Sequence, residues 1–219
     1  MRRLSIRGGE FTTIDDGEQT VIGDTVNVII INAALVSRAY FGKQFDPNKS
    51  TAPECWSDDT QRPSSNVPQE RIQARRCMDC TQNVRGSGDN GGRSCRFQQR
   101  LAVVFEGDLE EVYQLQIPAS SIFGRVVNGN MGMQEYARHL SSHGTAVISV
   151  VTNIAFDKDS VVPKLYFKPI RPIEKGTGSK IAEMVVHEDT KRAITSFVPV
   201  TSEPSPFGKV DGGFDINAN

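Results

Sequence analysis

The chain has 219 residues, of which 37% are hydrophobic and 23% are charged, and its formal net charge is -1. This composition is typical of a folded globular protein and excludes a chain that is disordered throughout. No apolar run approaches the roughly 20 residues that a membrane-spanning helix requires, so an integral membrane protein is not expected.

The N-terminal segment alternates runs of β-favouring residues with turn residues. The runs predict strands at 4–7, 11–14 and 20–31, with Gly8-Gly9 and Asp15-Asp16-Gly17 as the turns between them. The first residues are basic but lead into glycine rather than an apolar stretch, which does not fit a secretory signal. We therefore expect a cytoplasmic location, where cysteines stay reduced.

Residues 45–99 differ in character from the segments on either side. They are rich in Pro, Ser, Asn, Asp and Gly, and they have no apolar periodicity. A stretch of this length inside a compact protein is expected to be ordered by something other than a hydrophobic core. All four cysteines of the chain lie within it.

Regular elements resume after residue 99. A hairpin turn is expected at Gly107-Asp108, and Pro and Gly in residues 201–219 predict a flexible C-terminal tail. The apolar patterns predict strands at 100–106, 112–117, 145–156 and 164–170, and helices at 133–143 and 180–197. The fold class that these elements predict is α+β, dominated by β-structure.

The four cysteines have the spacing C-x21-C-x2-C-x14-C. We expect Cys55, Cys77, Cys80 and Cys95 to hold one structural Zn²⁺ per chain in a tetrahedral site, with no position open for catalysis. Zinc binding contributes roughly 10 kcal/mol or more, which would order a segment that has little apolar surface to bury. A redox-active C-x-x-C pair, or cysteines without a shared role, are the alternatives.

Arginines cluster around these cysteines and make the segment locally cationic. The planar guanidinium suits phosphate contacts, which predicts a nucleic-acid interface, although arginines that only solvate a loop are the alternative. The expected phosphate contacts are Arg38, Arg75, Arg76, Arg85, Arg93 and Arg96.

A second basic surface is expected on the strand at 164–170. The period of two places Lys164, Tyr166 and Lys168 on one face, with Leu165 and Phe167 on the other. An aromatic ring between two cations is a surface on which single-stranded nucleic acid binds. Three further aromatic residues lie beside basic or turn-forming residues and are candidates for base stacking: Tyr40, Trp56 and Phe97. The alternative is that these rings pack inside the protein, and in that case Trp56 covers the zinc site.

No nucleotide-binding, hydrolase or metalloprotease motif occurs in a convincing context, so no enzyme and no catalytic residue is expected. The letters G-x-G-x-x-G at 86–91 lie between cysteines, with no strand before them and no helix after them. The acid pairs at 15–16, 58–59 and 110–111 leave a metal-dependent nuclease as one alternative function.

The order of the motifs resembles a family of proteins from tailed bacteriophages and prophages. The resemblance covers roughly residues 4–172. It is carried by Cys55-Trp56-Ser57-Asp58, Cys77-x-x-Cys80, Asn83, Gly86-Ser87, Cys95, Arg100-Leu101-Ala102-Val103-Val104, Ile117-Pro118-Ala119-Ser120-Ser121-Ile122-Phe123 and Pro163-Lys164-Leu165-Tyr166-Phe167-Lys168-Pro169.

This family is similar to zinc-containing single-stranded DNA-binding proteins of phages. The resemblance implies a sequence-tolerant DNA-binding protein of phage replication or recombination in the host cytoplasm, with replication or recombination proteins as further partners. It also implies an OB-like β-barrel, which we expect to have five strands and to occupy residues 1–200, with 45–99 as a zinc-stabilised insertion and short helices outside it.

The C-terminal tail departs from the family pattern, because Glu203, Asp211 and Asp215 are sparse and Lys209 interrupts them. Recruitment of partners by this tail is therefore not expected. The main alternative function is a zinc-stabilised interaction module that docks a replication or transcription protein.

Overall fold

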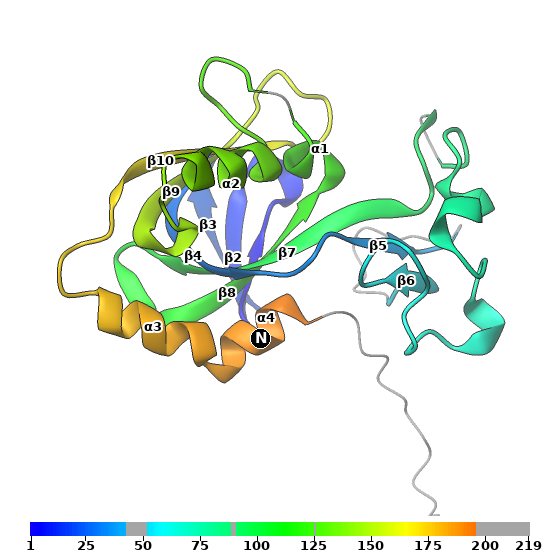
Figure 1. Cartoon of the computed structure of the whole chain (residues 1–219), viewed down its shortest axis with the longest axis horizontal. Coiled ribbons are helices and arrows are strands. Elements are labelled where there is room, and N and C mark those ends of the chain that lie inside the picture. The colour runs from blue at the N-terminus through cyan, green and yellow to red at the C-terminus, as the bar shows by residue number, and fades with distance from the viewer. Residues whose placement is uncertain (43–51, 89–90, 125, 196–219) are drawn as a thin grey trace, which may run out of the picture.

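A computed structural model describes residues 1–42, 52–88, 91–124 and 126–195. It confirms the β-dominated α+β class (Figure 1). The strands are β1 (Arg3–Ser5), β2 (Phe11–Asp15), β3 (Glu18–Gly23), β4 (Thr25–Ala33), β5 (Ser37–Tyr40), β6 (Cys55–Ser57), β7 (Arg96–Phe105), β8 (Asp108–Pro118), β9 (Val150–Phe156) and β10 (Leu165–Pro172). The α-helices are α1 (Ala119–Ile122), α2 (Met133–Ser142), α3 (Gly178–Val186) and α4 (Glu188–Ile194), and short 3-10 turns lie between them.

Eight of the strands form one curled, open sheet in the order β10-β9-β4-β7-β8-β1-β2-β3. The neighbours run antiparallel except for β1, which pairs with β8 in parallel. The curl brings strands near the two ends of the sheet toward each other: the ring centre of Phe11 on β2 lies 4.8 Å from that of Phe156 on β9. The sheet is a half-barrel with β3 and β10 at its ends, where a five-stranded OB-like barrel was expected.

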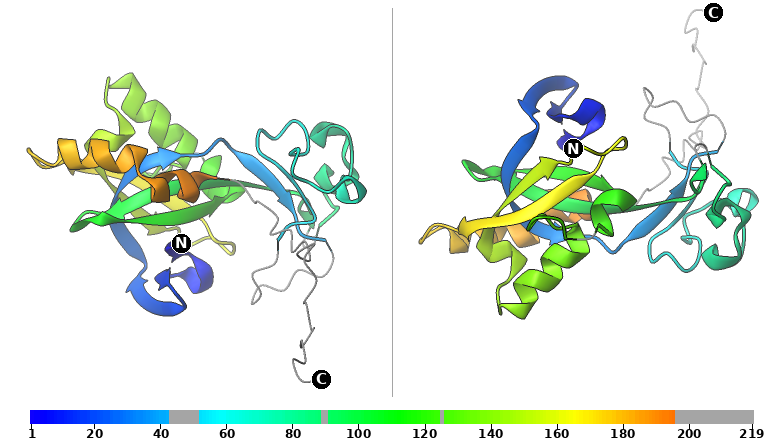
Figure 2. Two further views of the ribbon diagram at one scale, coloured as in Figure 1. Left: turned by 90° about the horizontal axis from the view of Figure 1, so that it is seen from below. Right: turned by 90° about the horizontal axis from the view of Figure 1, so that it is seen from above.

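The central strand β7 shows why the sheet has a core on both faces. Leu101 and Val103 point into a cluster that α2 covers, and Ala102 and Val104 point into a second cluster that α3 and α4 cover. All four side chains are buried because β7 lies between β4 and β8 with helices above and below (Figures 1 and 2). An uninterrupted apolar run is what such a position requires.

Two expected elements are each divided in the structure. The strand expected at 20–31 is β3 and β4, because Gly23 has a φ of 127° and ends the first strand. The helix expected at 180–197 is α3 and α4, because His187 has an extended ψ of 146° between them. Residues 196–219, which include the expected tail, lie outside the described residues.

The hairpin expected at Gly107 joins β7 to β8, and the helix expected at 133–143 is α2. Among the described residues, no helix has the length and apolar character that crossing a membrane demands.

Candidate metal centre and nucleic-acid interface

A lobe projects from the sheet at the N-terminal end of β7 (Figures 1 and 2). We call residues 37–42, 52–88 and 91–98 the cysteine lobe; its backbone is anchored because β5 pairs with both β6 and β7. The lobe has a small apolar core of its own, formed by Ala39, Tyr40, Cys55, Trp56 and Val67. Apolar burial therefore contributes to its order, which the composition of the segment did not predict.

Backbone hydrogen bonds fix the positions of the cysteines. Cys55 lies in β6 and pairs with Tyr40 of β5. Cys77 is the first residue of a 3-10 turn (Cys77–Asp79), and Cys80 directly follows that turn. The N–H of Cys77 donates to the carbonyl of Gln61 at 2.8 Å, and that of Cys95 donates to the carbonyl of Gln82 at 2.8 Å. Three segments distant in sequence are thus held beside one another.

All four cysteines are free thiols that line a single cavity of about 20 Å³. That volume accommodates one water-sized or ion-sized particle. In the part of the chain that the structure describes, no three His, Cys, Asp or Glu side chains are grouped as a bound metal ion would require. The four sulfur atoms share one cavity lining but are not arranged around a common metal position, so zinc ligation stays a prediction.

The cavity disfavours ionised thiols in the absence of a cation. Burial raises the pKa of Cys55 and Cys77, and it raises the pKa of Cys95 to about 12; repulsion from neighbouring thiolates adds to each effect. The backbone N–H of Gln73 opposes the shift at Cys55 because it donates to that sulfur, and the nearby Ser57 side chain opposes the shift at Cys77. A nearby cation would offset this cost of ionising Cys55, Cys77 and Cys95, and a tetrahedral Zn²⁺ has the donor preference that the four sulfurs of this lining offer.

Arg38, an expected phosphate contact, lies on the lining of this cavity. Its guanidinium carbon is 3.9 Å from the centre of the Phe97 ring, and its Nε and Nη1 atoms are buried with no hydrogen-bond partner among the described residues. The side chain is half-buried against the cavity, and this placement does not test its expected contact with DNA phosphates.

Tyr40 and Trp56 are placed differently from the expected stacking surface. Trp56 is 3% exposed and Tyr40 is 9% exposed, since both rings pack into the core of the lobe and line the cavity. Neither ring has a face that a base can reach in this structure. The alternative interpretation, in which the tryptophan covers the cysteine site, fits its position.

The other expected arginines point to the surface of the cysteine lobe. Arg75, Arg85, Arg93 and Arg96 are exposed, while Arg76 is exposed and forms a 2.7 Å ion pair with Asp79. A nearby acidic side chain is engaged internally: Asp59 accepts from the hydroxyl of Ser57 at 3.0 Å and from two backbone N–H groups. Those backbone bonds hold the pKa of Asp59 below its usual range.

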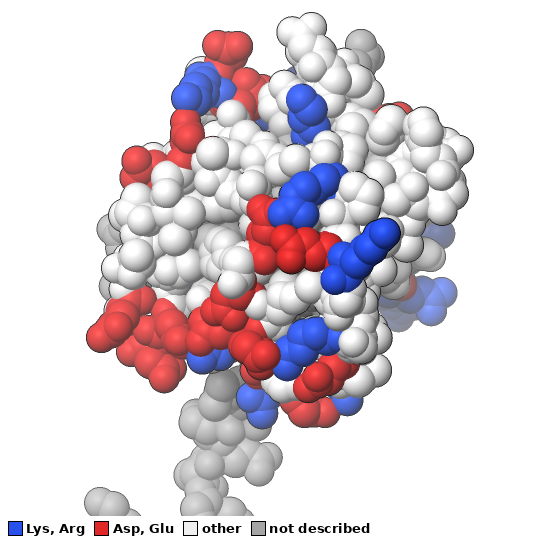
Figure 3. Space-filling model, turned by 90° about the vertical axis from the view of Figure 1, so that its left-hand side faces the viewer, with Lys and Arg blue, Asp and Glu red and all other residues white. Residues whose placement is uncertain are grey.

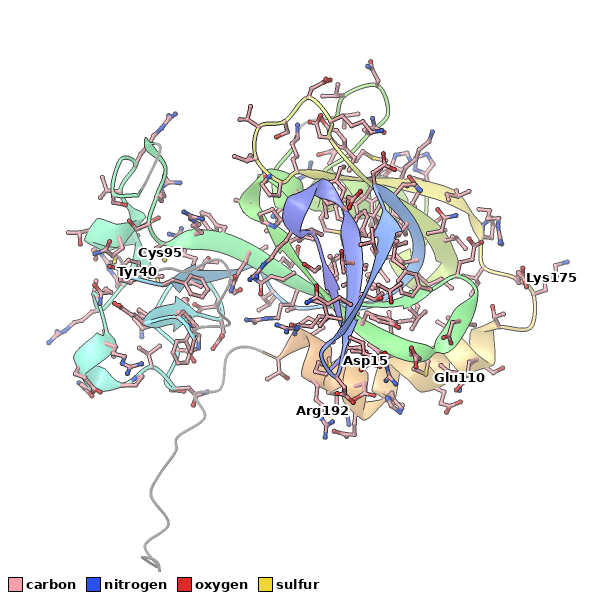
Figure 4. All side chains as sticks on the ribbon, turned by 180° about the vertical axis from the view of Figure 1, so that it is seen from behind. Asp15, Tyr40, Cys95, Glu110, Lys175 and Arg192 are labelled. Atoms are coloured by element: carbon pink, nitrogen blue, oxygen red, sulfur yellow. The ribbon has the colours of Figure 1, made fainter. Side chains whose placement is uncertain are left out.

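The end of the molecule opposite the lobe has a mixed charge. Figure 3 shows Asp and Glu side chains interspersed with Lys and Arg, with acidic ones gathered low on that face. In Figure 4, Tyr40 and Cys95 lie in the lobe, whereas Asp15, Glu110 and Arg192 lie on the sheet and helix body. Two of the acidic residues considered for a nuclease form ion pairs on this body, Asp15 with Arg2 and Glu110 with Lys180.

A pair of aromatic rings marks the junction between the lobe and the sheet. The half-buried ring of Phe97 meets the ring of Phe123 edge-on at 5.3 Å, and Phe123 is 47% exposed. Sequence reasoning missed Phe123, because it follows a predicted strand at a position where local pattern does not distinguish a surface ring from a core ring. Its partner Phe97 was expected.

The basic face expected on 164–170 has the predicted register on β10. Leu165 and Phe167 are fully buried, Lys168 is exposed, and Lys164 and Tyr166 are partly exposed. Lys164 is not a free cation, because its Nζ lies 2.7 Å from Asp157 Oδ2. Of this face, Lys168 presents the most accessible charge.

Helix α1 connects the two candidate surfaces. The hydroxyl of Ser121 on α1 accepts from the N–H of Leu165 at 2.8 Å, and Phe123 directly follows the helix. The start of β10 and the Phe97–Phe123 pair are therefore attached to the same short helix.

Comparison with known proteins gave no further information on this site. No family model, no curated protein and no solved structure matches the chain.

Proposed function

We propose that this protein binds single-stranded DNA without sequence preference, through a surface that starts on the cysteine lobe. The observation that carries the proposal is the exposure of Arg75, Arg85, Arg93 and Arg96 on the same lobe whose four cysteines line one cavity. Arginines held on a rigid module contact phosphates regardless of the bases between them.

Aromatic stacking is the second part of the proposed interface. The exposed ring of Phe123 against Phe97 offers a base a face at the junction of the lobe and the sheet, and Tyr166 with Lys168 offers another on β10. Stacking on a ring tolerates any base, because every base has a π-face. The half-barrel would serve as the rigid support that the OB-like barrel provides in the family that the sequence resembles.

Zinc would be the structural cofactor of this interface. Cys55, Cys77, Cys80 and Cys95 would hold one ion, which supplies the positive charge that lets the four thiols ionise together and ties the three backbone segments into one unit. The proposed role in phage replication or recombination, the cytoplasmic location and the absence of enzymatic activity rest on the sequence resemblance and motifs.

The alternative, a module that docks another protein, has one observation in its favour. Met78 is 72% exposed and Val84 is 59% exposed, so the lobe presents apolar as well as basic side chains. A protein partner would bury these side chains, whereas phosphate contacts would leave them in water.

A titration of a labelled oligo(dT) by fluorescence anisotropy, at two salt concentrations, tests the proposal. We expect binding whose affinity falls with salt, and a double variant Arg85→Ala/Arg93→Ala whose slope of log affinity against log salt is smaller by about 1.4. Arg138→Ala is the matched control, because Arg138 is exposed on α2 and pairs with Glu135. Absence of binding, or binding that salt does not weaken, would refute the proposal, and cleavage of the strand on addition of Mg²⁺ would favour the nuclease.

A further inference from the structure

Arg38 is a half-buried cation on the wall of the cysteine cavity. It projects from β5, and its Nε and Nη1 atoms are buried without a hydrogen-bond partner in the described part of the chain. Burying guanidinium nitrogens without hydrogen-bond partners is unfavourable, so a side chain retained in such a place is expected to have an anionic partner.

The groups that face Arg38 are the thiols of the cavity. Arg38 lines it together with all four cysteines. Neutral thiols would leave the guanidinium unbalanced. Four thiolates around one Zn²⁺ leave two negative charges on the centre, which is the kind of partner that a buried guanidinium requires.

We infer that Arg38 is the counter-ion of the metal centre: its N–H groups donate to the metal-bound thiolates that line the cavity, and it does not contact DNA. The inference rests on the zinc site proposed above. It makes Arg38 a positioning residue that stabilises the ligands, in the same outer shell as the Ser57 hydroxyl and the Gln73 N–H.

Phe97 explains why arginine suits this position. Its ring centre lies 3.9 Å from the guanidinium carbon, so the cation rests over an aromatic face at the edge of the cavity. Lysine has the charge but neither the plane nor the fork of donors. Removal of the charge should therefore weaken metal binding strongly, and replacement by lysine should weaken it less.

The test measures zinc affinity in the whole chain, by competition with a chromophoric chelator, for Arg38→Met, Arg38→Lys and Arg75→Met. We expect Arg38→Met to bind zinc 10–100-fold more weakly, Arg38→Lys to lie between it and the wild type, and Arg75→Met to match the wild type. Substitution by Co²⁺ gives a second readout, because the thiolate charge-transfer absorption should shift for Arg38→Met and stay unchanged for Arg75→Met.

The salt dependence of oligo(dT) binding, measured with zinc in excess, separates this role from a phosphate contact. Arg38→Met should retain the wild-type slope, whereas Arg75→Met should lower it by about 0.7. Wild-type zinc affinity in Arg38→Met, or a lowered slope in that variant, would overturn the inference.

The remaining outcomes also decide between the proposals. If Arg38→Met does not fold, Arg38→Lys carries the test, and wild-type zinc affinity together with an unshifted cobalt spectrum in that variant overturns the inference. A wild-type chain without affinity for zinc overturns both the metal site and the role of Arg38. A chain that binds zinc but not DNA removes only the proposed function, and the predicted order of zinc affinities still supports the role of Arg38.

Discussion

The hydroxyl of Tyr166 donates a 2.9 Å hydrogen bond to Oδ2 of Asp157, across the start of β10. The same carboxylate oxygen accepts from Lys164 at 2.7 Å. The Lys164 bond and then the Tyr166 bond hold the pKa of Asp157 below its usual range. The three side chains form one polar unit on the face that we propose for DNA.

This unit predicts a pH-dependent contribution of Asp157 to stability. Because the pKa of Asp157 is lowered in the folded protein, its contribution is present above the unfolded value of about 3.9 and is lost as the pH falls through the folded value. We expect Asp157→Asn to cost about 1 kcal/mol of unfolding free energy at neutral pH, and less at about pH 3.

Urea denaturation of the wild type and of Asp157→Asn at the two pH values measures this difference. Asp159→Asn is the control, because its side chain is exposed two residues away. A deficit of the same size at both pH values would show that the ionised form of Asp157 is not what stabilises the fold.

The two lysines of this face should differ in their effect on DNA binding. Lys168 is exposed, whereas Lys164 is engaged by Asp157. Lys168→Ala should lower the slope of log affinity against log salt by about 0.7, and Lys164→Ala should lower it by less. Equal slopes for Lys168→Ala and the wild type in the oligo(dT) titration would exclude β10 from the interface.

Phe123 is expected to contribute to binding rather than to folding. Because its ring is 47% exposed, Phe123→Ala should change the melting temperature little and should weaken oligo(dT) binding by about 1–3 kcal/mol, with the salt slope retained. Its neighbour Ile122 is fully buried, so Ile122→Ala should instead lower the unfolding free energy by about 2–5 kcal/mol. Unchanged affinity in a stable Phe123→Ala protein would contradict the stacking role.

Zinc removal should loosen the cysteine lobe and leave the sheet intact. We expect elemental analysis to find close to one zinc per chain, and Cys80→Ser to lose most of it. Hydrogen exchange should then accelerate at the amides of Cys77 and Cys95, and stay slow at Val103 in the centre of β7.

Met78→Ser is the control for that experiment. Met78 lies next to Cys77 in sequence, but its side chain is exposed and does not line the cavity. A wild-type protein that folds completely without zinc, with slow exchange at Cys77 and Cys95, would count against a structural metal.

The features that depend on local patterns could be predicted from the amino-acid sequence alone. Alternation was enough to bury Leu165 and Phe167 and to turn Lys168 outward, because successive strand residues point to opposite faces. The periodicity of 133–143 was enough to predict α2. The class of fold followed from the same patterns, since a strand or a helix buries the side that its own residues make apolar.

The directions in which the polar and aromatic side chains of the lobe point depend on contacts between segments that are distant in sequence. Arg38, Tyr40 and Trp56 resemble surface residues in their local context, yet the pairing of β5 with β6 and β7 turns all three onto the lining of one cavity. Phe123 meets Phe97 across a separation in sequence that no local pattern spans. Local periodicity specifies which side of an element is apolar, whereas contacts between distant segments specify which polar group is left buried and which ring is left exposed.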